Sequence, residues 1–131
     1  MAKIKKKKPI SIASRKAKAR KCQQWVAKKV SNLIGLPWGK DEQIASREMG
    51  QNGVDVRLVG EAREMWPWSV ECKWQESWNV PEAVKQAKAN QMNGTDWLVV
   101  MKKNQHDYVA ILDGDVFFDI LRLINGRRKG R

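Results

Sequence analysis

Residues 53–75 read GVDVRLVGEAREMWPWSVECKWQ and contain two strand-like runs separated by a turn region. Apolar residues recur at every second position over 54–59 and again over 69–74, which predicts two β-strands. Side chains two residues apart on a strand share a face, so Glu71 and Lys73 lie together, and pairing the runs as a hairpin could bring Asp55 onto that face. The stretch therefore predicts two carboxylates and an ammonium that converge.

Such a group of side chains is suited to a divalent cation. Carboxylate oxygens are hard ligands that fit Mg²⁺, which takes one or two protein carboxylates and completes its octahedron with water and substrate phosphate. The main-chain carbonyl of Cys72 is a further candidate ligand, and Lys73 could orient or help deprotonate a bound water. The alternative interpretation is a charged outer face of a hairpin, without chemistry.

Asp55, followed after a hairpin by Glu71-Cys72-Lys73, resembles the active-site signature of the PD-(D/E)XK nuclease superfamily. The surrounding SREMGQNGVDVRL, WSVECKWQ and DWLVVMKK are similar to Holliday junction resolvases and their small phage-encoded relatives over residues 46–103. The resemblance implies that Asp55 and Glu71 bind Mg²⁺, or Mn²⁺ in its place, and that Lys73 is the general base or positions water. It also implies a restriction-endonuclease-like core: a single α/β domain with a mixed central sheet flanked by helices. Val54 stands where the superfamily's name has Pro.

The two helices that flank the predicted strands match the family only in part. Gln86 matches a Gln that superfamily members often place on the helix after the second strand, near the metal site. Many relatives carry a metal-associated Glu on the first helix, but residues 1–34 contain no acid. Gln23 and Gln24 are the nearest substitutes there.

The missing acid could come instead from residues 39–53. Glu48 lies closest to Asp55 and is the candidate third acid, and Asp41 and Glu42 are weaker candidates. Glu48 could equally be a surface residue paired with Arg47.

Basic residues are concentrated at the two ends of the chain. The 131 residues include 26 Lys and Arg against 14 Asp and Glu, a net charge of +12, yet residues 1–29 and 126–131 contain no acid at all. Basic ends favour a polyanionic partner, because neutralising phosphates releases counterions. A solubilising or ribosome-associated tail is the alternative. The candidate nucleic-acid contacts are Lys5, Lys6, Lys7, Lys8, Arg15, Lys16, Arg20, Lys21, Arg47, Arg127 and Arg128.

Length and a 42% hydrophobic content predict one packed domain. We expect a basic disordered arm over residues 1–13, a nuclease domain over 14–125 and a basic tail over 126–131. Periodicity and capping signals predict helices over 14–33, from Asn79 to about residue 93, and over 116–124, with strands over 96–101 and 108–112. Asn125-Gly126 should end the last helix, whose expected packed residues are Val116, Phe117, Ile120, Leu121 and Ile124.

Tryptophans gather around the predicted hairpin. Trp66 and Trp68 lie between its strands, where exposed rings could stack on unpaired bases. Packing is favoured for at least one of them, because Trp usually lies in cores or interfaces.

Cysteine usage and hydropathy restrict the cellular location. Cys22 and Cys72 lack CxxC spacing, so neither a disulfide framework nor a zinc site is indicated, and a reducing compartment is expected. No apolar segment follows the basic N-terminus, so we expect neither secretion nor membrane spanning. The expected location is the cytoplasm of a bacterial host or cell.

These features together predict a Mg²⁺-dependent, structure-selective DNA endonuclease, most similar to a phage-type Holliday junction resolvase. Symmetrical cutting of a junction needs two active sites, so a homodimer on branched DNA is expected. The alternatives are a nuclease of the same chemistry that cuts nicked, mismatched or linear DNA, and a non-catalytic basic nucleic-acid-binding protein.

Overall fold

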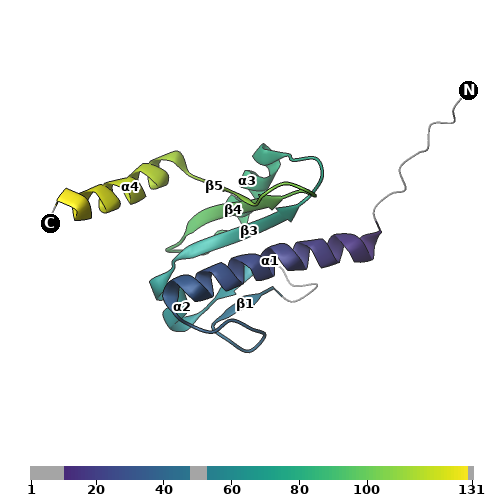
Figure 1. Ribbon diagram of the computed structural model, residues 1–131, viewed down its shortest axis with the longest axis horizontal. Helices are drawn as coiled ribbons and strands as arrows, with labels where there is room; N and C mark the ends of the chain where they lie inside the picture. Colours follow the sequence, from purple (N-terminus) through teal and green to yellow (C-terminus); the bar gives the residue numbers. More distant parts are fainter. Residues whose placement is uncertain (1–10, 48–52, 130–131) are drawn as a thin grey trace, which may run out of the picture.

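A mixed β-sheet with strand order β1-β2-β3-β4-β5 forms the centre of the protein (Figure 1). The computed structural model describes residues 11–47 and 53–129. β3 and β4 are parallel, and the other neighbouring strands are antiparallel. The strands are β1 (Ile44–Ser46), β2 (Val56–Leu58), β3 (Trp68–Trp74), β4 (Asp96–Lys102) and β5 (Val109–Leu112). The predicted single α/β domain with a mixed sheet is confirmed. Among the strands of the described residues, only β1 was not predicted, because it is too short to show periodicity.

One face of the sheet is covered by α1 (Ile12–Ile34). The helix begins two residues before its predicted start, because the Ser11 side chain accepts a hydrogen bond from the Ser14 N–H and caps it. It ends at Gly35, whose φ of 75° is the left-handed conformation that glycine adopts without strain. The buried residues Cys22, Val26 and Val30 pack this helix against the sheet.

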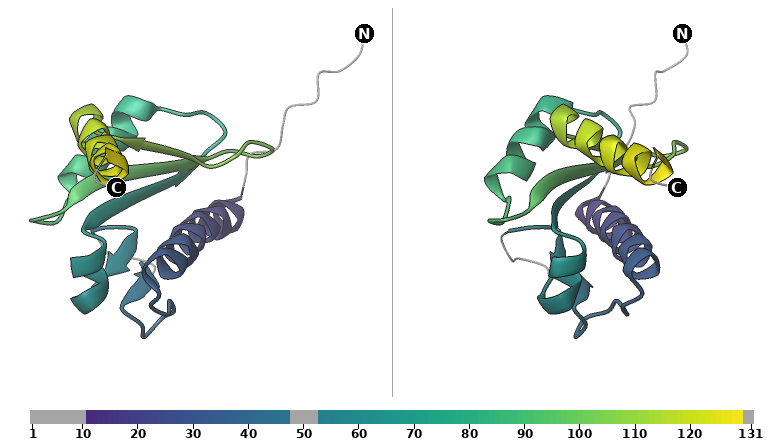
Figure 2. Two further views of the ribbon diagram at one scale, coloured as in Figure 1. Left: turned by 60° about the vertical axis from the view of Figure 1, so that its left-hand side comes forward. Right: turned by 90° about the vertical axis from the view of Figure 1, so that its left-hand side faces the viewer.

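The opposite face is covered by α3 (Val80–Ala89), which links the parallel strands β3 and β4 (Figure 2). The Glu82 N–H donates to Asn79 Oδ1 at 3.2 Å, which confirms the predicted N-cap. Small residues, Ala83 and Ala87, let the helix approach the sheet closely. The helix ends at Ala89, before the predicted end near residue 93.

A short helix, α2 (Gly60–Met65), replaces the turn region expected between β2 and β3. The Gln43 side chain, distant in sequence, accepts a hydrogen bond from the Ala62 N–H at 3.0 Å and fixes this helix beside β1. Trp66 then packs against the core beneath α1, which confirms that at least one of the two neighbouring tryptophans is a packing residue.

The last helix, α4 (Gly114–Lys129), leaves the sheet after β5 and projects beyond it (Figure 1). The Asp113 side chain accepts a hydrogen bond from the Val116 N–H and caps the helix. Two predictions are wrong. The helix passes through Asn125-Gly126 to Lys129, since a glycine costs a helix only about 1 kcal/mol. Phe117 and Ile124, expected in the core, are each 44% exposed, because α4 extends from an edge strand instead of crossing a face.

Candidate functional site: a carboxylate and lysine cleft

The candidate site lies where β2 begins and β3 continues past it. Val56, the first residue of β2, is opposite Val70 of β3, and the Asp55 N–H donates to the Val70 carbonyl at 3.0 Å. The antiparallel register therefore places Asp55 alongside Glu71, the next residue of β3. This confirms the expected approach of the two carboxylates.

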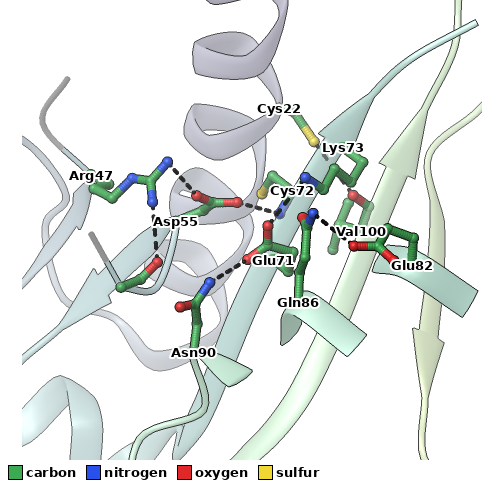
Figure 3. Close-up of polar contacts among 11 residues, drawn as sticks. Cys22, Arg47, Asp55, Glu71, Cys72, Lys73, Glu82, Gln86, Asn90 and Val100 are labelled. Carbon is green, nitrogen blue, oxygen red and sulfur yellow. Dashed lines mark hydrogen bonds and ion pairs between the residues drawn. The ribbon is translucent and has the colours of Figure 1, made fainter. Parts of the chain in front are cut away.

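Asp55 is buried, with 3% of its surface exposed, and both of its carboxylate oxygens have protein partners (Figure 3). The Cys72 N–H donates to Oδ2 at 2.7 Å, and the Arg47 guanidinium lies 3.1 Å from Oδ1. Arg47 also donates to the Gly53 carbonyl at 3.2 Å, which holds it in place. The carboxylate thus joins the end of β1, the start of β2 and the middle of β3.

Glu71 and Lys73 project from the same face of β3, as the strand period requires. Lys73 Nζ lies 3.5 Å from Glu71 Oε1, and Asn90 Nδ2 lies 3.5 Å from Glu71 Oε2 (Figure 3). Glu71 is 6% exposed. Lys73 remains partly accessible, so its ammonium can reach the space in front of the two carboxylates.

Burial raises the pKa of both carboxyl groups. For Asp55 the Cys72 N–H, Arg47 and Lys73 oppose the effect of burial, but the pKa remains above its ordinary value. For Glu71 the negative charge of Asp55 adds to burial, and Lys73 and Asn90 oppose it. Burial therefore disfavours the ionised form of both carboxyl groups, and a bound cation would stabilise that form.

The pH dependence of stability should reveal the cost of ionising the buried Glu71. Because the folded-state pKa of Glu71 lies above its unfolded-state value, its stabilising contribution is complete below the ordinary glutamate pKa and is lost as pH rises through the folded-state pKa. The Gln side chain of Glu71→Gln cannot ionise. In EDTA, the difference in free energy of unfolding between this variant and wild type should therefore favour the variant more strongly at about pH 7 than at about pH 4. Urea unfolding at both pH values measures the difference, and an equal difference at both would contradict the prediction.

Cys72 presents its backbone to the site and its side chain to the core. The thiol lies beneath α1 with Cys22, and this contact together with burial raises the pKa of Cys72 well above its ordinary value. A thiolate ligand is therefore disfavoured. The N–H and C=O of one strand residue point to the same neighbouring strand, so the Cys72 carbonyl points to the side on which Asp55 accepts its N–H.

An open cleft of about 510 Å³ lies in front of these groups. One stripe of α1 forms a wall, because residues three, four, seven and eight apart share a helix face. This stripe consists of Arg15, Lys18, Ala19 and Gln23. The other lining residues are Arg47, Asp55, Glu71, Cys72, Lys73, Trp74, Gln75, Glu76 and Ser77.

The structure brings most, but not all, of the predicted site residues together. Asp55, Glu71, Cys72 and Lys73 meet in the cleft, and Arg15 and Arg47 stand at its sides. Gln86 does not line it: its amide lies 3.5 Å from Glu82 Oε1, and Asn90, one turn further along α3, contacts Glu71 instead. Among the remaining predicted contacts, the exposed residues outside the cleft lining are Lys16, Arg20, Lys21 and Arg127.

Some predicted residues fall outside the part of the chain that the structure describes. Glu48, the candidate third acid, is one of them, together with Lys5, Lys6, Lys7, Lys8 and the side chain of Arg128. The weaker acid candidates Asp41 and Glu42 are described, and neither lines the cleft. Within residues 11–47 and 53–129, no group of three or more His, Cys, Asp or Glu residues lies close enough together to hold a metal ion.

The sequence analysis did not predict two of the residues at the site, Asn90 and Lys18. Asn90 lies four residues after Gln86 and so shares its helix face. Extending the candidates along that face by one turn would have included it. Of the two glutamines named as substitutes for a first-helix acid, Gln23 is buried and lines the cleft, whereas Gln24 does not line it. Lys18 faces the cleft although nothing in the basic run distinguishes it from its neighbours.

The fold and the cleft define a class: a small α/β protein with two buried carboxylates and a lysine at an open, basic-walled site. A scan of protein-family models and searches of curated proteins and of solved structures each returned no match. Among the helices that the structure describes, none has the length and apolar character needed to cross a membrane.

Proposed function

We propose that this protein is a Mg²⁺-dependent DNA endonuclease that selects branched DNA, similar in kind to a phage-type Holliday junction resolvase. The observation that carries the proposal is the meeting of Asp55, Glu71 and Lys73 in one cleft. Their order and spacing match the nuclease motif, and a mixed sheet flanked by helices agrees with the core of that superfamily. A charged outer face of a hairpin would not bury its two acids.

The residues present fit a magnesium ion. Two carboxylates with raised pKa values and a neighbouring backbone carbonyl are oxygen ligands, and Mg²⁺ needs no more than one or two protein carboxylates. Asp55, Glu71 and the carbonyl of Cys72 would hold it. When bound, such an ion polarises a phosphodiester and lowers the pKa of a coordinated water.

The side chains of the chain itself supply the rest of the chemistry. The Lys73 ammonium can position the attacking water or donate to a phosphate oxygen, and Glu71, 3.5 Å away, orients it. Asn90 holds the other Glu71 oxygen. Hydrolysis would leave a 5′-phosphate and a 3′-hydroxyl.

DNA would enter a cleft that basic side chains line. Arg15 and Lys18 of α1 line it together with Arg47, and neither Arg15 nor Lys18 has an acidic neighbour on that helix. These side chains can hold phosphates on both sides of the scissile bond, a contact that positions the strand without reading its sequence. Cutting two strands of a junction symmetrically would need a homodimer.

The direct test is cleavage of a labelled four-way junction and of a linear duplex with the same sequence. With Mg²⁺ or Mn²⁺ the purified protein should cut the junction, and EDTA should stop the reaction. Equal cutting of both DNAs would support nuclease activity but contradict selectivity for branched DNA, and it would favour nicked, mismatched or linear substrates. Binding without cutting in either metal would contradict nuclease activity and favour a non-catalytic nucleic-acid-binding protein.

A further inference from the structure

The helix α4 exposes a broad apolar surface. Phe117, Phe118, Leu123 and Ile124 have exposed fractions of 44%, 61%, 68% and 44%. They lie on a helix that projects beyond the sheet (Figure 1). No other helix in the described part of the chain exposes two adjacent phenylalanines.

The arrangement of these residues around α4 is typical of a helix that packs against another surface. Over residues 115–124, at 100° per residue, the apolar side chains occupy more than half of the helix circumference. The remaining narrow face carries Asp115, Asp119 and Arg122, of which the last two form an ion pair at 3.0 Å. Contiguous exposed apolar surface of this kind marks an interaction site.

A matching apolar groove lies between α1 and the strands β4 and β5. It has a volume of about 150 Å³, and an apolar cavity of this size accepts one benzene ring. Leu33, at its rim, is 71% exposed. Its other lining residues are Trp25, Val26, Lys29, Val30, Trp66, Leu98, Val100 and Ala110.

The same chain thus carries an uncovered apolar helix and a groove that one phenyl ring fills. Its own α4 starts directly after β5 and leads away from the body, so its phenylalanines remain exposed (Figure 1). Charge matches only locally. Asp115 and Asp119 lie in the first two turns of α4, beside the phenylalanines, whereas Lys29 of the acid-free helix α1 lines the groove. The basic residues of α4 follow in its later turns, at positions 122 and 127–129.

We infer that the occupant is a second copy of this chain: α4 of each protomer docks in the α1 and β5 groove of the other, with the Phe118 ring in the groove. A twofold arrangement makes this contact twice. Two phenylalanines and two or three aliphatic side chains per contact bury an area on the order of 1,200 Å² in total, the lower limit for a stable interface. The inference stands on these surfaces and not on the proposed nuclease activity.

Light scattering after size-exclusion chromatography, without DNA or metal, tests the dimer. Wild type should have twice the mass of one chain, and Phe118→Asp should raise the dimer dissociation constant about tenfold or more. Because Phe118 is 61% exposed, this variant should keep the circular dichroism spectrum of wild type. The control Arg122→Gln changes the charged face of α4 and should remain dimeric. A monomeric wild type, or a dimer indifferent to Phe118→Asp, would overturn the inference.

Crosslinking with a short bismaleimide tests where α4 docks. The two natural cysteines are buried, so Phe118→Cys and Leu33→Cys each add one accessible thiol. A mixture of the two single variants should give a crosslinked product of two chains, and neither variant alone should give it. No product in the mixture, or a crosslink formed only inside the double variant, would show that α4 does not occupy the groove of a partner.

Discussion

Glu71→Gln is expected to lower the rate of Mg²⁺-dependent junction cleavage at least about a hundredfold and to leave the protein folded. The amide has the shape of the carboxylate but lacks the charge that would hold a cation. Glu71 lies beside Asp55 and 3.5 Å from Lys73, so its loss would remove one of the proposed Mg²⁺ ligands and also the partner of the Lys73 ammonium. Single-turnover cleavage of a labelled four-way junction at saturating protein concentration measures the chemical step separately from DNA binding.

The matched control for this variant is Glu64→Gln. Glu64 is exposed on α2 and does not line the cleft, so its replacement makes the same chemical change away from the site. It should cleave like wild type. Junction binding in EDTA should be retained by both variants, because the basic walls remain. Full cleavage activity in Glu71→Gln would remove Glu71 from the chemistry and with it the main support for the nuclease proposal.

Asp55→Ala is expected to reduce the free energy of unfolding by about 2 kcal/mol as well as to abolish cleavage. The Asp55 carboxylate accepts the Cys72 N–H at 2.7 Å in a buried position and neutralises Arg47. Alanine leaves that N–H without its acceptor, at a cost of about 1–3 kcal/mol, whereas the partly exposed Arg47 can turn to water. Release of the buried carboxylate charge offsets part of the loss. Urea unfolding in EDTA measures the change.

Asp55→Asn separates the structural role of this residue from its chemical one. The amide oxygen can still accept the Cys72 N–H, and the neutral group no longer carries the cost of burying a charge. Its stability should therefore stay within about 1 kcal/mol of wild type, while cleavage should fall as far as in Asp55→Ala. If Asp55→Ala were as stable as wild type, the hydrogen bond across the open end of β2 would contribute nothing to the fold.

Several features of the fold and site follow from local sequence. Alternation over residues 69–74 is enough to place Glu71 and Lys73 on one face of β3, because the strand period is exactly two residues. The Asn79 cap is similarly local, since an N-cap and its acceptor lie three residues apart. The approach of Asp55 to Glu71 follows once the two runs are paired as neighbours.

Other features depend on packing between distant segments, and here prediction from sequence was incomplete or wrong. Apolar periodicity showed that α4 has a surface to bury, but it does not specify which surface covers it, so Phe117 and Ile124 were wrongly expected in the core. The three residues of β1 become a strand only because β2 lies beside them. α2 is held by Gln43, which lies outside the helix itself.

The sequence by itself determined the runs that form β2 to β5, the Asn79 cap and the acid–lysine motif of β3, because each depends on residues within one turn or one strand. Only the tertiary structure decided that Arg47 neutralises Asp55, that Asn90 and not Gln86 contacts Glu71, and that one stripe of α1 walls the cleft. Those contacts join elements 8 to more than 30 residues apart along the chain. Their geometry depends on how the helices pack on the two faces of the sheet. That packing depends on side chains from the whole core, so no single segment of sequence specifies it.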